Sequence, residues 1–179
     1  MRKATRFLLA LAVALVLMLC FRALAFTICT VEGAGLEPLF HQGDRVLVNR
    51  WSYGLRVGGD DGLISYRRIG RSQMELGDLV AFENPQNTSQ VLICRCKALP
   101  GDTIEVDGQT MVIPARKNCA STDHYWLEAI GPDNTTDSHT LGLIPEQYII
   151  GRAVMVIYNH DTSQPIWRGW DSSRFFSSL

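Results

Sequence analysis

Several common functional classes leave no mark on this sequence. Its 179 residues carry 17 Lys and Arg against 18 Asp and Glu, and the basic residues are scattered, which argues against a nucleic-acid-binding face. It has no Cys-x-x-Cys pair, and its four histidines are far apart along the chain, so the spacing predicts no metal site. Repeats and low-complexity segments are also missing. We therefore expect one domain that needs no metal or other cofactor.

The five cysteines say little by themselves. Cys20 lies in an apolar run, where a thiol behaves as a small inert apolar group. A disulfide from Cys96 to Cys119 is compatible with the sequence, and so is no disulfide at all, because pairing cannot be read from spacing.

The N-terminus has the pattern of a membrane-targeting segment. Residues 1–6 contain three basic side chains, and residues 7–28 are almost entirely apolar. In one interpretation, 1–6 is a cytoplasmic flank, 7–28 a transmembrane anchor of about 20 residues, and 29–179 an extracytoplasmic domain. In another, the run is a cleaved secretory signal that ends at Ala23-Leu24-Ala25. A third interpretation is an ordinary buried helix.

Downstream of residue 28 the pattern changes to short β-branched segments without sustained helical periodicity. Asp102–Ile113 alternates apolar and polar residues around Asp107-Gly108, which predicts a hairpin. Residues 56–74 are glycine-rich and charged and predict a surface loop, and residues 84–89 predict a turn or loop. Further strands are expected at residues 45–49, 77–82, 91–94, 125–130 and 149–158. The fold class is therefore mainly β.

One segment carries more information than the rest. Residues 31–56 contain Pro38, Gly43-Asp44, Val48-Asn49-Arg50 and Tyr53-Gly54 in a fixed order. This frame resembles the segment of type I signal peptidases (leader peptidases, the Ser/Lys peptidases of family S26) that carries the nucleophilic serine. The position of that serine is Gly35, and the position of the serine that helps to hold the oxyanion is Gly33.

Three more segments resemble the family in the same order. They are Gly77–Phe82, Ile93–Asp102 and the stretch from Gly131 to Arg152. Together with the first segment they cover most of the chain beyond the N-terminal run. The resemblance implies an antiparallel coiled β domain of the signal-peptidase type with a small hairpin cap, tethered by one N-terminal transmembrane helix.

The resemblance also implies that the chemistry has been lost. Intact members use a serine activated by a neutral, desolvated lysine, and the lysine position here is Cys94, followed by the retained Arg95. Losing the nucleophile of such a site removes on the order of 10⁶ in kcat. Supporting positions are Arg95, Thr135 and Asp137; without a lysine to orient, Thr135 and Asp137 are expected to hold a turn.

Two alternatives remain at this stage. Cys94 could itself be a nucleophile with Lys97 or His41 as its base, or a subunit could supply the missing groups to an active signal peptidase. Val31, Leu36, Leu92 and Ile93 match the family's peptide groove, although core packing would explain them equally well.

The expected partners follow from this assignment. They are the lipid bilayer and preproteins, exported or pilin-like subunits, or a sister signal peptidase, at a bacterial cytoplasmic (inner) membrane with the domain facing the periplasm or the outside. An aromatic set could lie against the bilayer or pack inside the domain: Trp51, Tyr53, Trp167, Trp170, Phe175 and Phe176. An unrelated membrane-tethered β protein is the remaining class.

Overall fold

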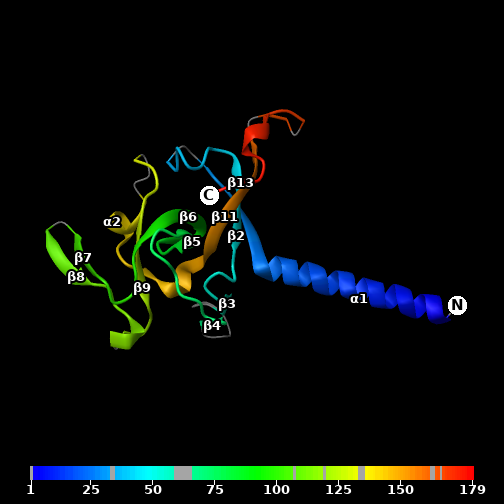
Figure 1. The fold of residues 1–179 in the computed structure, drawn as a ribbon, viewed down its shortest axis with the longest axis horizontal. Coiled ribbons are helices and arrows are strands. Elements are labelled where there is room, and N and C mark those ends of the chain that lie inside the picture. The colour runs from blue at the N-terminus through cyan, green and yellow to red at the C-terminus, as the bar shows by residue number, and fades with distance from the viewer. Residues whose placement is uncertain are drawn as a thin grey trace.

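A β domain with one projecting helix makes up the structure, a computed structural model (Figure 1). It describes residues 2–32, 35–58, 66–106, 108–118, 120–132, 136–161, 164–165 and 167–179. Helix α1 (Arg2–Ala25) extends away from the domain and leads directly into β1 (Phe26–Thr30). The other strands are β2 (Asp44–Asn49), β3 (Leu55–Val57), β4 (Arg67–Ile69), β5 (Leu79–Asn84), β6 (Asn87–Ala98), β7 (Thr103–Val106), β8 (Gln109–Val112), β9 (His124–Glu128), β10 (Ile144–Pro145), β11 (Ile149–His160), β12 (Trp170–Asp171) and β13 (Ser177–Ser178). Short helical turns are η1 (Arg116–Asn118), α2 (Ser138–Leu141), η2 (Glu146–Tyr148) and η3 (Ser172–Arg174).

One large sheet organises the domain. Its strand order is β1-β2-β11-β5-β6-β9-β10, with β12 and β13 also paired to β11, and its paired strands are antiparallel. Strand β5 is buried along nearly its whole length, because apolar clusters cover both of its faces. Val46, Val48 and Ala81 belong to one cluster, and Val80 and Phe82 to the other. The alternating side-chain directions of a strand supply both clusters from one segment.

The mainly β prediction is confirmed, with two local corrections. Strands β7 and β8 form the predicted hairpin, although Asp107 of its turn lies outside the described residues. The prediction of a surface loop for residues 56–74 was wrong where β3 and β4 pair and where Arg68 and Met74 are buried. Residues 59–65 of that segment lie outside the described residues. The loop predicted for residues 84–89 was also too long, since β6 begins at Asn87.

The N-terminal segment differs from its prediction at one end. The helix ends at Ala25, so residues 26–28 of the predicted anchor belong to β1, which pairs with β2. Within the part of the chain that the structure describes, no helix combines the length and the apolar character needed to cross a membrane. The transmembrane anchor is therefore not confirmed.

Two other open questions from the sequence are answered by burial. Cys96 is a free, buried thiol, so it forms no disulfide in this structure, and Cys119 lies outside the described residues. Tyr53 is buried, and its hydroxyl donates a hydrogen bond to Asp78 at 2.9 Å. It does not belong to an exposed aromatic patch, whereas the other five aromatic residues of that set are exposed: Trp51, Trp167, Trp170, Phe175 and Phe176.

A buried carboxylate ties the two ends of the β domain together. Asp44, at the start of β2, is fully buried. It accepts hydrogen bonds from the Arg174 guanidinium at 2.5 Å, the Asn159 amide at 2.8 Å and the backbone N–H of His41 at 2.9 Å. The Arg174 Nη2 group also donates to the carbonyl of Leu39 at 3.0 Å. The C-terminal segment thereby fixes the loop that precedes β2.

These contacts set the charge state of Asp44. Burial by itself raises the pKa of this carboxyl, but the hydrogen bonds from Arg174, His41 and Asn159 and the positive charge of Arg174 outweigh it, so the pKa lies below its ordinary value of 3.8. A lowered pKa in the folded state stabilises the fold above the unfolded-state pKa. That stability is lost as pH falls toward the folded-state pKa.

We expect Arg174→Met to lower the free energy of unfolding by about 3 kcal/mol at pH 7, because it leaves a buried carboxylate without its cation. The difference from the unchanged protein should shrink as the pH falls below the ordinary carboxyl pKa of 3.8 toward the lower pKa of folded Asp44. Urea unfolding followed by tryptophan fluorescence measures both effects. Arg168→Met is the matched control, since Arg168 is an exposed arginine of the same C-terminal segment. Equal midpoints for the two variants at pH 7 would contradict the role of Asp44.

Candidate functional site

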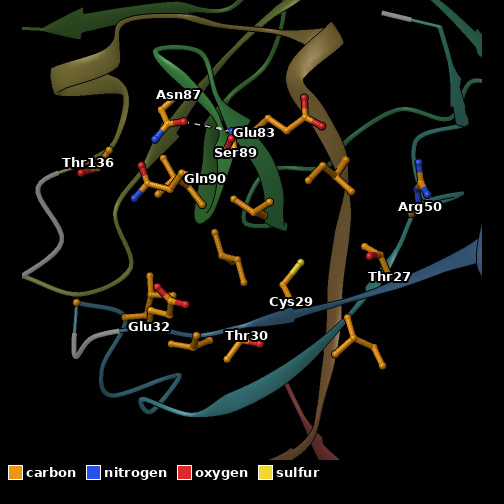
Figure 2. A pocket seen from close by; sticks show the side chains of 18 of the residues that line it. Thr27, Cys29, Thr30, Glu32, Arg50, Glu83, Asn87, Ser89, Gln90 and Thr136 are labelled. Carbon is orange, nitrogen blue, oxygen red and sulfur yellow. Dashed lines mark hydrogen bonds between the residues drawn. The ribbon is translucent and has the colours of Figure 1, made fainter. Parts of the chain in front are cut away.

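A groove of about 1140 Å³ runs between the first strand and the β5–β6 hairpin (Figure 2). On one side lie residues of β1 and the segment after it, including Thr27, Cys29 and Glu32. On the other side lie Asn87 and Gln90 of β6. The remaining lining residues come from the turn after β2, from β3, β5 and β11 and from the Thr136 segment, and they include Arg50, Arg56, Glu83, Thr136 and Ile150.

The structure places the predicted groove residues together. Val31 and Leu36 lie on the β1 side of the groove, and Leu92 and Ile93 lie on the β6 side. Val31 and Ile93 are buried and also belong to one apolar cluster, so the two interpretations of these residues are compatible. They make the floor apolar, while the polar residues stand along the rim. That they contact a peptide stays a prediction.

Gly35, the residue predicted to occupy the position of the serine, lines the groove, and Gly33 lies outside the described residues. The backbone around Gly35 packs closely against Gly131. A Cβ atom at residue 131 would lie 2.6 Å from the carbonyl oxygen of Gly35 and 2.5 Å from that of Glu37. Only glycine allows this approach, because both distances are far below van der Waals contact. The segment from Gly131 onward therefore holds the Gly35 loop in place.

Cys94, the residue predicted to occupy the position of the lysine, does not line the groove, although its neighbour Ile93 does. It is fully buried among Val80, Phe82 and Leu127, on the face of β6 opposite Ile93. Its Sγ atom is 3.9 Å from the carbonyl oxygen of Thr136, a residue that lines the groove. Burial, together with the negative charge of Asp137, raises the pKa of the Cys94 thiol to about 12. The thiol is therefore neutral and can neither accept a proton as a base nor attack as a thiolate.

Of the supporting positions, Asp137 has a clear structural task. It is buried and caps α2: Oδ1 accepts from the N–H of His139 at 2.9 Å, and Oδ2 accepts from the N–H of Ala129 at 3.0 Å. The Thr140 hydroxyl completes a capping box. Thr135 lies outside the described residues. Asp137 thus holds a turn beside Cys94.

Arg95 lies away from the groove. Its side chain lines a smaller cavity of about 360 Å³ with Asp78, Arg152 and Leu179. Lys97, the base considered for a Cys94 nucleophile, is exposed and forms an ion pair with Glu128 at 3.7 Å. Neither basic side chain lines the groove.

The groups that do line the groove form no catalytic pair. The Cys29 thiol and the Thr27 and Ser89 hydroxyls make no hydrogen bond to a carboxylate, imidazole or amine of the residues described here. Burial raises the pKa of Cys29, which disfavours its thiolate. An activated nucleophile needs a base within hydrogen-bond reach, and this geometry supplies none to these three groups.

Sequence reasoning missed the polar rim of this groove. Asn87 and Ser89 were assigned to a loop over residues 84–89, and the predicted strand began only at residue 91, yet residues 87–90 extend β6 along one side of the groove. Residues 87–90 are all polar, so they show no alternation that would predict a strand. Cys29 was the other missed residue, because a single cysteine after an apolar run carries no positional signal.

Comparison with known proteins places this architecture in a family. The model of the family described as signal peptidase, peptidase S26, matches residues 4–125, more than half of the chain. The chain belongs to the signal peptidase family. The match includes the Gly35 segment and the Cys94 segment. That these two residues occupy the positions of the family's serine and lysine stays a prediction.

Individual relatives agree with this assignment. The chain is 28% identical to the probable signal peptidase I-1 of Synechocystis over 167 residues, which cover 80% of this chain and 77% of the relative. It is 24% identical to mitochondrial inner membrane protease subunit 2 of Saccharomyces cerevisiae over 131 residues, covering 73% and 67%. Signal peptidase I of Bacillus licheniformis is 28% identical over 131 residues, covering 72% and 61%.

The burial of Cys94 gives a direct prediction. A thiol with a pKa of about 12 is ionised in about one molecule in 10⁴ at pH 8, so Cys94 should resist N-ethylmaleimide in the folded protein and react after unfolding in urea. Mass spectrometry of the tryptic peptides measures the labelling. The partly exposed Cys29 is the internal comparison. Labelling of native Cys94 as fast as Cys29 would contradict the inert thiol.

Proposed function

We propose that this signal peptidase family member is a catalytically inactive protein that binds extended peptide segments in the groove. The observation that carries the proposal is the pairing of Gly35 in the groove with a buried, neutral Cys94 that does not line it. The groove supplies a binding site, and the two positions that perform chemistry in the family carry no nucleophile and no base. What remains is a binding surface.

Two free strand edges support binding of an extended segment. Strand β1 ends the order of the large sheet, and its only partner among the described strands is β2. Strand β6 pairs with β9 only from Arg95 onward, so residues 87–94 have one open edge in the described structure. Both edges border the groove. Unpaired N–H and C=O groups on such edges accept an added strand.

The groove and its open strand edges predict which interactions give affinity for a peptide and which give a preference among peptides. Backbone pairing supplies affinity without regard to sequence, and the side-chain pockets supply the preference. The apolar floor near Gly35 suits small apolar side chains, and the rim of Asn87, Ser89 and Gln90 suits polar ones. Preproteins, exported or pilin-like subunits and a sister signal peptidase are the partners that we propose on this basis.

We expect the purified full chain to bind a preprotein peptide with an Ala-x-Ala site and not to cleave it. Binding is read from slower alkylation of Cys29, which lines the groove, and cleavage from mass spectrometry of the peptide. The rate of peptide cleavage should be lower than that of an active relative by a factor on the order of 10⁶. If the scaffold is intact, the double variant Gly35→Ser with Cys94→Lys should regain measurable cleavage.

The single variants are the controls for this experiment. Gly35→Ser alone lacks a base and Cys94→Lys alone lacks a nucleophile, so each should remain silent. Cleavage by the unchanged chain that disappears in Cys94→Ala would overturn inactivity and favour an active signal peptidase with altered catalytic groups. Unchanged alkylation of Cys29 at saturating peptide would overturn the binding role.

We further propose that the protein works at the surface of a membrane, namely the bacterial cytoplasmic membrane. The support comes from helix α1, which projects from the domain with exposed apolar side chains such as Phe7, Leu11 and Leu15 (Figure 1). Exposed aromatic residues of the C-terminal segment, Trp167, Trp170 and Phe176, add a second apolar surface. Trp side chains favour the interface between lipid and water.

The full chain should therefore float with lipid vesicles in a density gradient. The double variant Leu11→Asp with Leu15→Asp should lose most of this association, because each charge must be moved into an apolar medium. Val112→Asp is the matched control, since Val112 is equally exposed on the β7–β8 hairpin. Flotation of the double variant to the same extent as the control would contradict the role of α1.

A further inference from the structure

Three arginines converge on one carboxylate at a surface separate from the groove. Glu146, at the start of η2, is largely buried, with 9% of its side chain exposed. Arg68 of β4 lies 3.4 Å from its Oε1, and Arg71 lies 3.0 Å and Arg116 of η1 lies 3.9 Å from its Oε2. The cluster joins segments that are 75 residues apart in sequence. None of these four residues lines the groove.

The charge of Arg68 is already matched inside the protein. Its side chain is fully buried and donates to the carbonyls of Gly54, at 2.9 Å, and Glu146, at 3.0 Å, and to that of Ile149. It also donates to the hydroxyl of Tyr66 at 2.8 Å. A buried arginine with this set of acceptors and one carboxylate forms a complete ion pair. Its partner Glu146 therefore has little negative charge to spare for a second cation.

Arg71 and Arg116 share one carboxylate oxygen, so their two positive charges are only partly neutralised inside the protein. Both side chains are 39% exposed, and both approach the same Oε2 atom, so their Nη2 atoms are no more than about 7 Å apart. The Asp123 carboxylate accepts the backbone N–H of Arg116 at 2.8 Å, and no ion pair joins it to either guanidinium in the described structure. Lys117, exposed in the same turn as Arg116, adds further positive charge.

We propose that Arg71 and Arg116 form a docking site for an acidic side chain of a partner protein. The two oxygens of one carboxylate can accept from both guanidinium groups at this separation. Arg68, Arg71, Arg116 and Lys117 exceed the negative charges of Glu146 and Asp123 by two, so this surface attracts an acidic group. The site thus fits an Asp or Glu on an acidic protein surface.

The site is independent of peptide binding in the groove. The arginine cluster is formed by β4, by Arg71 just after β4, and by the short turns η1 and η2. The groove lies between β1 and β6. A partner held here leaves the groove open to a separate segment. Two contacts on one molecule would raise the effective concentration of a groove-bound segment if both belonged to the same partner.

Fluorescence anisotropy tests the proposal with the full chain. The probe is a fluorescein-labelled peptide that contains two Glu residues in a Gly-Ser background, and its comparison is the same peptide with Gln in place of Glu. We expect the Glu peptide to bind more tightly and its affinity to fall with added salt. Arg71→Met and Arg116→Met should each weaken binding by about three- to tenfold.

The controls separate this site from general charge effects. Arg67→Met removes the same charge from the other face of β4, where Arg67 is exposed, and should leave affinity within about twofold. Arg71→Lys keeps the ion pair with Glu146 and should retain part of the binding, and near-ultraviolet circular dichroism reports the fold of each variant. Alkylation protection of Cys29 by the preprotein peptide should not change in any of them.

Three outcomes would overturn the proposal. The first is equal binding of the Glu and Gln peptides. The second is equal loss in Arg67→Met and Arg71→Met, which would mean a diffuse effect of net charge. The third is displacement of the Glu peptide by inorganic phosphate at a lower concentration than by acetate at matched ionic strength, which would replace the carboxylate by a phosphate ligand.

Discussion

The groove depends on a buried negative charge at the beginning of β2. Asp44 has no access to water, so its carboxylate must be satisfied inside the protein. Its three partners come from the loop before β2, from β11 and from the C-terminal segment. The same arginine also holds the carbonyl of Leu39. The loop that leads from Gly35 to β2 is therefore positioned by residues from the other end of the chain. Gly131 confines this loop from a second side.

Gly35 and Cys94 are both held by defined structural features. Gly35 lines the groove beside the close approach of Gly131, and Cys94 lies near the helix α2 that Asp137 caps. Cys94 fills its place as a core residue, surrounded by apolar side chains. A lysine at such a position is useful to an enzyme because burial lowers its pKa. A thiol in the same surroundings becomes less reactive, since burial raises its pKa.

The fold class and the family were predictable from the sequence, because they rest on alternating strands and on ordered motifs. The hairpin at residues 103–112 and the strand at 45–49 are examples. Strand β4 was not predictable: it has three residues, two of them arginines, and its stability comes from Arg68 donating to carbonyls far away in sequence. The buried role of Arg68 depends on residues about 80 positions away, and no local pattern carries that information.

The same limit applies to the site. Gly35 and Cys94 were found by their place in a motif, yet the sequence could not show that one lines the groove and the other does not. Side-chain direction on β6 settles this, and the direction depends on register with β5, where Cys94 faces Val80. The end of the N-terminal helix was missed for a related reason. Phe26 and Ile28 are apolar enough for a helix, but pairing with β2 places them in a strand.

The long separation between Asp44 and Arg174 bears on the order of events during synthesis. The two residues are 130 positions apart, so a ribosome making this chain releases the first half of the groove well before the guanidinium that completes the Asp44 shell. Until then the Asp44 carboxylate lacks its cation, so the shell around it is completed only after the C-terminal segment has been made.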